Sequence, residues 1–569
     1  MSDMHRALAT GYHNLSVWAD LLDRINVFPV ADGDTGVNLR LSLVPLRDLA
    51  AEAARTGDLL ARCAIGNSGN IAAAFFREFC RARDFADLAG YAARGREKAW
   101  QALVRPRAGT MLDVFDSLAA TLGGKTEPIQ LYPLLCKELH KTVLATSRML
   151  PDLRRAGVVD AGALGMFAFF EGFFRQLAGQ TMASASILEL FAGKLAVNAA
   201  FQAKPTDSYC VNAVIDTGGN QAGADKSLAA LGDSVVALAA ETGLKVHIHT
   251  ADRRQLRARL SALGEIVHWS DEAIDAGGLA RFAQPARKQA LHIMTDAAGS
   301  ITREMARRHG ITLLDSYILA DDSSRPESLC SPADIYALMR RGSKVTTAQA
   351  SVFERHHCYQ SVCQRFGRTL YLCAGSIYTG NYDIARRWQE ENDADNLLEV
   401  VDTGAASGRL GLVALLTARY AEHAASPDDV VEFAGKILAG CQEYVFIDQL
   451  QYLVAGGRVS TAGGFLAGLL HLKPVISPAR EGVRKAGVVR SRKGQLAFAL
   501  ERLRKEFALS AAPVIMLQYS DNEQWVAETM QPKVRELLPR AEILLTALSL
   551  TSGVHMGPGT WSLAWAGGR

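Results

Sequence analysis

The chain has 569 residues, which is too long for one hydrophobic core and predicts about three to five domains at roughly 100–200 residues each. Its 62 Lys and Arg and 59 Asp and Glu leave a net charge of +3, and such an even balance gives no reason to expect nucleic acid as a partner. Hydrophobic residues make up 49% and charged residues 21%, which is typical of a globular protein and excludes the disordered and collagen-like classes.

The N-terminal segment MSDMHRALATGYHNLSVWAD has no apolar stretch of the kind found in a signal peptide. The longest apolar stretch, at residues 161–174, is interrupted by Glu171 and is shorter than the roughly 20 residues of a membrane span. We therefore expect a cytoplasmic protein that does not cross a membrane. The nine cysteines form no C-x-x-C pair, so the sequence predicts no disulfide framework.

Residues 1–195 predict a helical domain, because apolar residues recur at three- and four-residue spacing and β-branched runs are few. Four short glycine-containing segments interrupt this pattern, and we place them in interhelical loops and at helix N-termini. They are ADGDTG at 31–36, GNSGN at 66–70, RAGT at 107–110 and VDAGALG at 159–165.

Residues 205–285 predict a small α+β module, with strands at 209–217, 233–241 and 243–252 and a helix around 253–263. Residues 288–569 then alternate strand and helix, a pattern typical of βαβ units and a mostly parallel sheet. The strands of this third part are expected at 289–296, 311–319, 368–374, 396–402, 512–519 and 542–549.

The first glycine-containing segment places two carboxylates, Asp32 and Asp34, on either side of Gly33 and directly before a helix that begins near Val37. Two oxygen ligands on a backbone that can bend at a glycine suit a hard cation such as Mg²⁺, which binds through one or two carboxylates and substrate phosphates. An ordinary turn with Asp34 as the helix N-cap explains the same spacing. Spacing alone leaves both interpretations open.

The segment NVFPVADGDTGVN resembles the ATP-site motif of the dihydroxyacetone-kinase L-type domain, also called DAK2, in the version found in bacterial fatty acid kinases. The resemblance continues in order through GNSG at 66–69, GTMLD at 109–113 and GVVDAG at 157–162. It implies an all-α barrel that binds ATP at one end, with carboxylates holding two Mg²⁺ ions on the phosphates. The sequence has no G-x-x-x-x-G-K-[ST], so a P-loop is excluded.

Carried over to this sequence, the resemblance makes Asp32 and Asp34 ligands of Mg²⁺. It also places Asn26 close to the position where related kinases have a third ligand, which is acidic. Each Ser-Gly or Gly-Thr pair of the other loops, taken alone, is typical of a helix cap. Together with the acidic loop they are expected to bind phosphate, as helix N-termini do. The further residues implied for the nucleotide site are Thr35, Asn38, Ser68, Gly69, Thr110, Asp160 and Gly162.

The middle module contains Cys210 in one expected strand and His247 and His249 in another. An H-x-H pair on a strand directs both imidazoles to one face, and with a thiolate it supplies three ligands of the kind that zinc takes. From spacing alone, a buried structural role is the better explanation of these residues. The segments YC at 209–210, LGDS at 231–234 and KVHIHT at 245–250 resemble the central domain of fatty acid kinases, in which a Cys and two His bind zinc.

The third part resembles the DegV family of fatty-acid-binding proteins over residues 288–569. The resemblance implies two α/β parts around an apolar tunnel, with the acyl carboxylate held by Thr347, Ser376 and His555; taken alone, each of the three is as typical of a strand end or a turn. The family's hydroxyls are replaced by Ala297, Ala348 and Gly375, which leaves a different amphipathic ligand open. The glycines at 456–457 predict a tight turn before Arg458. The motifs are IMTD at 293–296, VTTAQAS at 345–351, GSIYTGNY at 375–382, VVDTGAASGRLG at 400–411, LQYLVAGGRVS at 450–460, LLHLKPVI at 469–476 and VHMGPGTWSLAW at 554–565.

These resemblances together predict a fusion of the two components of a bacterial fatty acid kinase, in which ATP, Mg²⁺ and Zn²⁺ serve the phosphorylation of a protein-bound fatty acid to an acyl phosphate for phospholipid synthesis. A membrane acyltransferase downstream fits that product, and a homodimer is typical of such kinases. Two alternatives stay open: a kinase for a triose or another small hydroxy substrate, and a non-catalytic lipid-binding or sensor protein.

Overall fold

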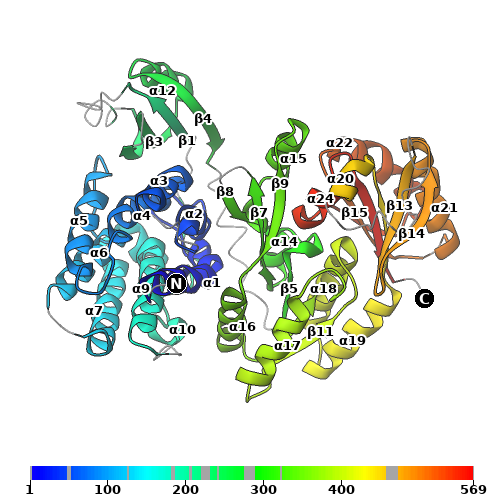
Figure 1. Cartoon of the computed structure of the whole chain (residues 1–569), viewed down its shortest axis with the longest axis horizontal. Coiled ribbons are helices and arrows are strands. Elements are labelled where there is room, and N and C mark those ends of the chain that lie inside the picture. The colour runs from blue at the N-terminus through cyan, green and yellow to red at the C-terminus, as the bar shows by residue number, and fades with distance from the viewer. Residues whose placement is uncertain are drawn as a thin grey trace. The chain divides into compact units, whose positions relative to one another are not determined.

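The computed structural model divides the chain into two compact units, Met1–Pro285 and Ala286–Arg569 (Figure 1). Each unit is described separately below. The structure describes residues 3–47, 53–124, 127–180, 186–203, 208–218, 228, 231–239, 243–274, 289–320, 323–455, 472–509 and 511–567. The turn predicted at 456–458 lies outside these residues.

The first half of the N-terminal unit is helical, as the sequence predicts. Its apolar core contains a cluster of phenylalanine rings, among them Phe75 and Phe115, whose centroids are 4.1 Å apart. The apolar stretch at 161–174 forms most of α9, which is buried on all sides within this core. The helices are α1 (Asp3–Arg24), α2 (Thr35–Leu43), η1 (Val44–Leu46), α3 (Ala53–Cys63), α4 (Gly66–Phe79), α5 (Leu88–Gln101), α6 (Met111–Leu122), α7 (Pro128–Met149), α8 (Pro151–Ala156), α9 (Ala161–Leu177) and α10 (Ile187–Leu190).

The second half of this unit is a four-stranded antiparallel sheet in the order β2-β3-β1-β4, with one helix packed against it (Figure 1). The helix α12 buries Leu256 and Leu260 against the sheet and exposes its arginines. The strand β4 follows α12 and was not among the predicted elements. The elements are β1 (Tyr209–Asp216), β2 (Asp233–Ala239), β3 (Gly243–Thr250), α12 (Arg253–Ser261) and β4 (Glu265–Ala273).

Backbone hydrogen bonds join this sheet to the helical half. The segment that follows α5 runs antiparallel to β2: Ala237 N donates to Ala102 O at 2.9 Å, and Val104 N donates to Val235 O at 3.3 Å. On β3, the Lys245 ammonium donates to the last carbonyls of α3, those of Ala61 and Arg62. These contacts fix one face of the sheet over the loops of the helical half.

The described residues of the C-terminal unit form three sheets. One is parallel, in the order β11-β10-β5-β6, one has six strands in the order β14-β13-β12-β17-β15-β16, and a third is an antiparallel group, β8-β7-β9. The strands are β5 (His292–Asp296), β6 (Ile311–Leu314), β7 (Ser316–Ala320), β8 (Ser323–Pro326), β9 (Val345–Gln349), β10 (Thr369–Cys373), β11 (Leu398–Asp402), β12 (Gln442–Phe446), β13 (Lys473–Ala479), β14 (Gly482–Val489), β15 (Val514–Tyr519), β16 (Glu542–Ala547) and β17 (Trp561–Ala566).

Two sequence predictions for this unit are wrong. The apolar run at 311–319 is not one strand, because the chain turns at Asp315 and sends β6 and β7 into different sheets. The prediction of a mostly parallel sheet is correct for the four-stranded sheet only. In the six-stranded sheet, β15 and β16 are parallel and the other neighbouring strands are antiparallel. Apolar composition predicts burial of a strand but not the direction of its neighbour.

The helix α18 packs in the apolar core that joins the parallel sheet to the six-stranded sheet. Its N-terminus meets the carboxylate of Glu443, which is fully buried and accepts hydrogen bonds from Gly408 N at 3.1 Å and Arg409 N at 3.0 Å. The helices of this unit are η2 (Ala297–Gly299), α14 (Arg303–Arg308), η3 (Glu327–Leu329), α15 (Pro332–Arg340), α16 (Val352–Phe366), α17 (Asn381–Asn392), α18 (Ser407–Ala421), α19 (Pro427–Gly440), α20 (Leu450–Ala455), α21 (Arg492–Glu506), α22 (Glu523–Trp525), η5 (Val526–Met530), α23 (Gln531–Leu537) and α24 (Leu550–Met556).

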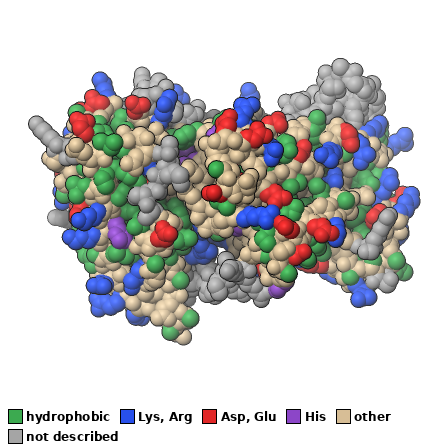
Figure 2. Space-filling model, turned by 90° about the horizontal axis from the view of Figure 1, so that it is seen from below, with side chains coloured by type: hydrophobic (Ala, Val, Ile, Leu, Met, Phe, Trp, Pro, Cys, Tyr) green, Lys and Arg blue, Asp and Glu red, His purple; other side chains and the backbone are tan. Residues whose placement is uncertain are grey.

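Among the helices of the described ranges, none combines the length and the apolar character that a membrane crossing needs. On the face drawn in Figure 2, basic and acidic side chains both occur across the surface, in keeping with the small net charge.

Candidate functional site

The loop before α2 presents the acidic pair. Gly33 has a φ of 69°, in the left-handed region that glycine adopts without cost, and this turn brings Asp32 and Asp34 together. Burial, followed by the charge of Asp34, raises the pKa of Asp32 well above its ordinary value. Burial likewise raises the pKa of Asp34 to about 6. Because both carboxylates are costly to ionise in this position, a bound cation would stabilise their ionised forms.

Asp34 holds the N-cap position of α2, but its side chain makes no capping hydrogen bond. That role falls to Asp23 of α1, whose Oδ1 accepts from Gly36 N at 2.6 Å and from Val37 N at 3.2 Å. The two helices approach so closely that a Cβ on Gly36 would lie 2.0 Å from the Ala19 carbonyl oxygen. Because Asp23 satisfies the first amides of α2, the Asp34 carboxylate is available to the loop's own site.

Three polar side chains near the acidic pair each have a buried oxygen atom that lacks a hydrogen-bond partner. Asn26 donates through Nδ2 to Asp32 Oδ1 at 2.6 Å, but its own Oδ1 has no partner. The same holds for Asn67 Oδ1 and for the hydroxyl of Ser68, which is 7% exposed at the start of α4. Buried polar atoms of this kind normally find a partner, so these atoms indicate a place for a polar ligand.

Two other predicted residues act as helix caps in this structure. Thr110 and Asp113 form a capping box at the start of α6, and the Thr110 hydroxyl donates to Arg107 O at 3.0 Å. Asp160 caps α9 by accepting from Ala163 N at 2.8 Å, and burial raises its pKa to about 7. Both capped helix starts line the same cavity as the acidic pair.

One cavity of about 360 Å³ joins these residues to the middle module. The acidic pair, Thr35, Ser68, Thr110, Asp160 and Gly162 line its helical wall. Residues of the sheet line the opposite wall, among them Ser234, His247 and His249. Of the other predicted residues, Asn38 lies beside this wall, its amide approaching Gly66, and Gly69 packs against Ser42, where a Cβ would lie 2.0 Å from the hydroxyl oxygen. The structure therefore brings the two predicted sites of the N-terminal unit into one place.

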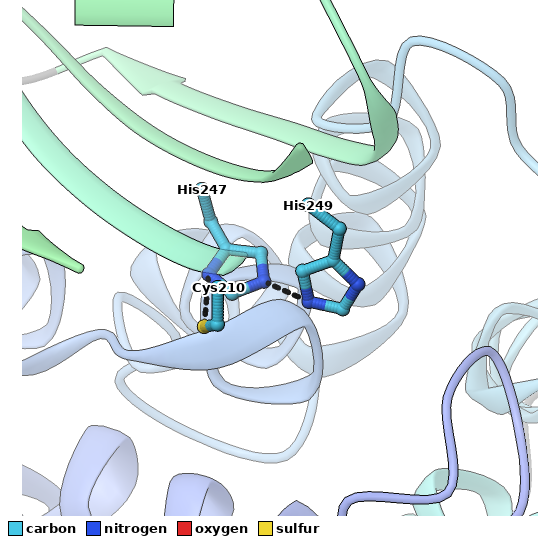
Figure 3. A group of neighbouring side chains, drawn as sticks. All are labelled: Cys210, His247 and His249. Carbon is cyan, nitrogen blue, oxygen red and sulfur yellow. Dashed lines mark hydrogen bonds between the residues drawn. The ribbon is translucent and has the colours of Figure 1, made fainter. Parts of the chain in front are cut away.

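The predicted zinc ligands point toward one another from adjacent strands (Figure 3). The ligand atoms of Cys210, His247 and His249 all lie within 4.8 Å of one another, and within the described ranges they are the one such group of metal-binding side chains. His247 Nε2 lies 3.1 Å from His249 Nε2, and Cys210 Sγ lies 3.9 Å from His247 Nδ1. Tetrahedral zinc places its nitrogen ligands roughly 3.3 Å apart, so the spacing of the imidazoles fits this ion.

The protonation states of this cluster follow from its surroundings. Burial, followed by the charge of His249, lowers the pKa of His247 well below its ordinary value, so the imidazole is neutral. His247 Nδ1 lies 2.9 Å from Asn212 Oδ1, an acceptor that favours the proton on Nδ1 and leaves the Nε2 lone pair for a metal. Burial, followed by the charges of Asp34 and Asp32, raises the pKa of the Cys210 thiol to about 12. A bound cation would offset this cost and favour the thiolate.

In the C-terminal unit, the structure brings together two of the three residues predicted to hold a carboxylate. Thr347 of β9 and His555 of α24 are hydrogen-bonded, with Oγ1 and Nε2 3.1 Å apart. The Ser376 hydroxyl instead donates to Asp402 Oδ2 at 2.6 Å, and Ser376 N donates to Asp402 Oδ1 at 3.0 Å. Ser376 thus has a different partner from the other two.

Sequence reasoning missed Asp23, which caps the helix after the acidic pair, and Asn212, which hydrogen-bonds to His247. A signal for Asp23 exists: it lies four residues after Ala19 and eight after Leu15, on the buried face of α1. Asn212 lies two residues after Cys210 on β1, so strand alternation places it on the same face as the thiol.

Three family models match the chain in succession. Residues 29–175 match the DAK2 domain, residues 206–275 match the FakA-like middle domain of fatty acid kinases, and residues 290–567 match the uncharacterised protein family DegV. The chain thus combines a DAK2 domain, a FakA-like middle domain and a DegV domain, as its motifs predict.

Two curated relatives of this chain are described as uncharacterized proteins. A protein of Staphylococcus saprophyticus is 31% identical over 274 residues, which cover 42% of this chain and 49% of that protein. A protein of Staphylococcus haemolyticus is 28% identical over 269 residues, with the same coverage. The chain therefore spans about half the length of the curated relatives it matches.

Solved structures similar to this chain match about half of it. DegV, described as a fatty acid binding protein from Bacillus subtilis, has a TM-score of 0.45 and 19% identity, covering 49% of this chain and 99% of that chain. A DegV family protein from Thermus thermophilus, described by its fatty acid binding, has a TM-score of 0.45 and 24% identity, covering 48% of this chain and 99% of that chain.

Proposed function

We propose that this chain is an ATP-dependent kinase that phosphorylates the carboxylate of a fatty acid, giving an acyl phosphate and ADP. The observation that carries the proposal is the shared cavity of the N-terminal unit. There, an acidic pair, buried polar atoms without partners and a thiol-imidazole cluster line one space of about 360 Å³. The barrel arrangement of the helices, with ATP at one end, is part of the same proposal.

The helical wall fits a nucleotide with magnesium. Asp32 and Asp34 offer buried carboxylate oxygens, and the unpartnered Asn26 Oδ1 lies beside them as a neutral oxygen donor. Ser68 and the first amides of α4 would donate hydrogen bonds to phosphate oxygens. Magnesium, when bound there, supplies neutralisation of the phosphate charge.

The chemistry proposed needs no general base. A fatty acid carboxylate has a pKa near that of a glutamate side chain, about 4.3, and is ionised at neutral pH. The residues of the cavity therefore have to position the carboxylate and the terminal phosphate and to exclude water. The imidazoles of His247 and His249 line the cavity and belong to the proposed zinc cluster. In this reaction neither imidazole has to remove a proton from the substrate.

The cluster of Cys210, His247 and His249 would hold zinc with a fourth position open. Asn212 orients the His247 ring, and the carboxylates that raise the pKa of Cys210 favour a cation nearby. Because His247 and His249 also line the cavity, we place this ion at the substrate side of the site and not in a remote structural position.

The C-terminal unit would bind the acyl chain, with Thr347 and His555 donating hydrogen bonds to its carboxylate. The product class, an acyl phosphate, suits an acyltransferase that consumes activated acyl groups in phospholipid synthesis.

Release of ADP by the purified full-length chain tests the proposal. With ATP, Mg²⁺ and sodium oleate, we expect ADP release that depends on the oleate and an acyl phosphate trapped by hydroxylamine as the hydroxamate. The matched control is the Asp34→Asn variant under the same conditions. Oleate bound by the chain without any oleate-dependent ADP release would contradict the proposal and support a non-catalytic lipid-binding protein.

A further inference from the structure

The strand β4 carries an acidic residue beside the thiol-imidazole cluster. In the sheet, Cys210 of β1 pairs with His249 of β3 on one side and with Glu272 of β4 on the other. The register shift between β1 and β4 occurs at Val214 and Ile215, further along the strand. Residues directly opposite in an antiparallel pair have Cβ atoms about 4.5–5.5 Å apart on the same face. Glu272 is therefore the cross-strand neighbour of the thiol.

The face of the sheet that carries this pair also lines the cavity. Val211, the residue after Cys210, packs in the apolar core formed with α12, so Cys210 faces the opposite way, toward the helical half. Ser208 and Ile274 form the next pair on that same face, with Ile274 N donating to Ser208 O at 2.9 Å, and both residues line the cavity. Strand alternation therefore places Glu272 on the cavity side of β4.

The charge of Glu272 acts on both proposed cation sites. Burial and the charges of the acidic pair are the main causes of the raised pKa of Cys210, and the charge of Glu272 comes next. Glu272 also contributes, after burial and the charge of Asp23, to the raised pKa of Asp34. Its carboxylate is thus near the thiol, although it lies outside the group of ligand atoms within 4.8 Å of one another. Because Glu272 is exposed, a change of rotamer can bring its carboxylate closer.

Zinc held by one thiolate and two neutral imidazoles keeps a net charge of about +1 and lacks one ligand of a tetrahedron. His247 and His249 are buried, and an uncompensated charge among buried groups is costly. A carboxylate in the fourth position would make the site neutral. We propose that Glu272 supplies this fourth ligand while no substrate is bound. The inference rests on the zinc site of the proposed function and goes beyond it, because a substrate group that reaches the ion must then replace Glu272 or join it as a fifth ligand.

Metal binding by the full-length chain tests this assignment without turnover. Glu272→Gln keeps the size of the side chain but loses the anionic ligand, and Glu272→His offers another zinc ligand of similar length. Two quantities are measured: the zinc affinity, by competition with a chelator, and the affinity of the Co²⁺-substituted protein for azide, from its visible absorption. Glu265→Gln, at an exposed position of the same strand, is the matched control, and Asp34→Asn tests the acidic pair as the source of the fourth ligand.

We expect Glu272→Gln to weaken zinc binding roughly tenfold or more and to strengthen azide binding, because the fourth position then holds exchangeable water. Glu272→His should recover most of the zinc affinity. Unchanged zinc and azide affinities in Glu272→Gln would overturn the inference, as would a loss of zinc affinity in Asp34→Asn alone, which would assign the fourth position to the acidic pair. A parent chain that binds no zinc would instead refute the proposed zinc site itself, and this inference with it.

Discussion

The carboxylate of Asp23 caps the helix whose N-cap position belongs to Asp34, accepting the hydrogen bond from Gly36 N at 2.6 Å. Asp23, eleven positions before Asp34 in the sequence, thus accepts the hydrogen bonds of the first amides of α2. The carboxylate of Asp34 is therefore not needed as the cap of this helix. Because Asp23 caps the helix, both carboxylates of the acidic pair, Asp32 and Asp34, can face the cavity.

Asp23→Ala should lower both stability and activity. The loss of two hydrogen bonds to a buried carboxylate is expected to cost about 1–3 kcal/mol of unfolding free energy. Activity should fall by more than the loss of folded protein explains, because Asp34 becomes the nearest group that can cap α2. Urea unfolding and oleate-dependent ADP release measure the two effects. Asp252→Ala, which removes the cap of α12, is the matched control; equal activity in the two variants would contradict this role for Asp23.

Asp34→Asn should separate stability from function. Burial raises the pKa of Asp34 to about 6, so ionisation of this carboxyl opposes folding at neutral pH in the metal-free protein. The asparagine variant is therefore expected to unfold at the same or a higher temperature without Mg²⁺, while turnover falls on the order of 100-fold. Thermal unfolding in EDTA and steady-state kinetics check both parts. A variant that is less stable and still active would show that the carboxylate serves the fold.

Removal of the zinc ligands should change metal content. We expect about one zinc per chain in the purified protein, measured by inductively coupled plasma mass spectrometry, and its loss in a Cys210→Ala, His249→Ala double variant. Asn212→Ala should lower zinc affinity roughly tenfold or more, because the His247 ring loses the acceptor that orients it. His268→Ala, at an exposed position of the strand β4, provides the control. Unchanged zinc in the double variant would exclude this cluster as the metal site.

Glu327 should give the C-terminal unit a pH-dependent stability. Burial raises its pKa from 4.5 to about 7, while Thr551 at the start of α24 donates to it through the backbone amide and the hydroxyl. The folded state therefore binds an extra proton between about pH 4.5 and pH 7. The free energy of unfolding therefore contains a contribution from Glu327 that is fully present below pH 4.5. This contribution, roughly 3 kcal/mol, is lost as the pH rises through 7.

Glu327→Gln tests this assignment. The variant keeps an acceptor for Thr551 N but cannot ionise, so the difference in unfolding free energy between pH 5 and pH 8 should shrink by roughly that amount. Urea unfolding followed by tryptophan fluorescence at the two pH values measures it. Equal differences in the variant and the parent chain would show that Glu327 does not titrate in this range.

Thr347→Ala and Ser376→Ala should differ in their effect on fatty acid binding. Thr347 contacts His555 directly, and its loss is expected to weaken oleate binding about tenfold. The Ser376 hydroxyl donates to Asp402, so its removal should have a smaller effect. Fluorescent fatty acid displacement by oleate gives both affinities. The reverse order of effects would place the acyl carboxylate at Ser376.

Motifs and helical periodicity were sufficient to predict the helical half, the strands around Cys210 and His247, and the order of the three domains. They could not predict that β2 pairs with the segment after α5, because that pairing joins parts of the chain more than a hundred residues apart and depends on backbone groups that every residue carries. The same limitation explains the error at 311–319, where the apolar pattern is continuous although Asp315 ends one strand before the next begins.

The acidic pair and the imidazole pair were predicted separately, because each belongs to a motif that resembles a different domain. Their meeting in one cavity depends on the packing of the sheet against the helices, through contacts such as that of Lys245 with the end of α3. The domain limits at 195, 205 and 288 stay predictions.

The strand pair between residues 102–104 and β2 also limits how this chain can vary in length. Side chains alternate between the two faces of a strand, so one residue inserted or deleted within residues 102–104 would reverse the faces of the side chains that follow and leave the pairing with β2 out of register. Loops elsewhere on the helical half can change length without this effect. The short segment after α5 should therefore keep its number of residues in any chain that pairs it with β2 in the same way.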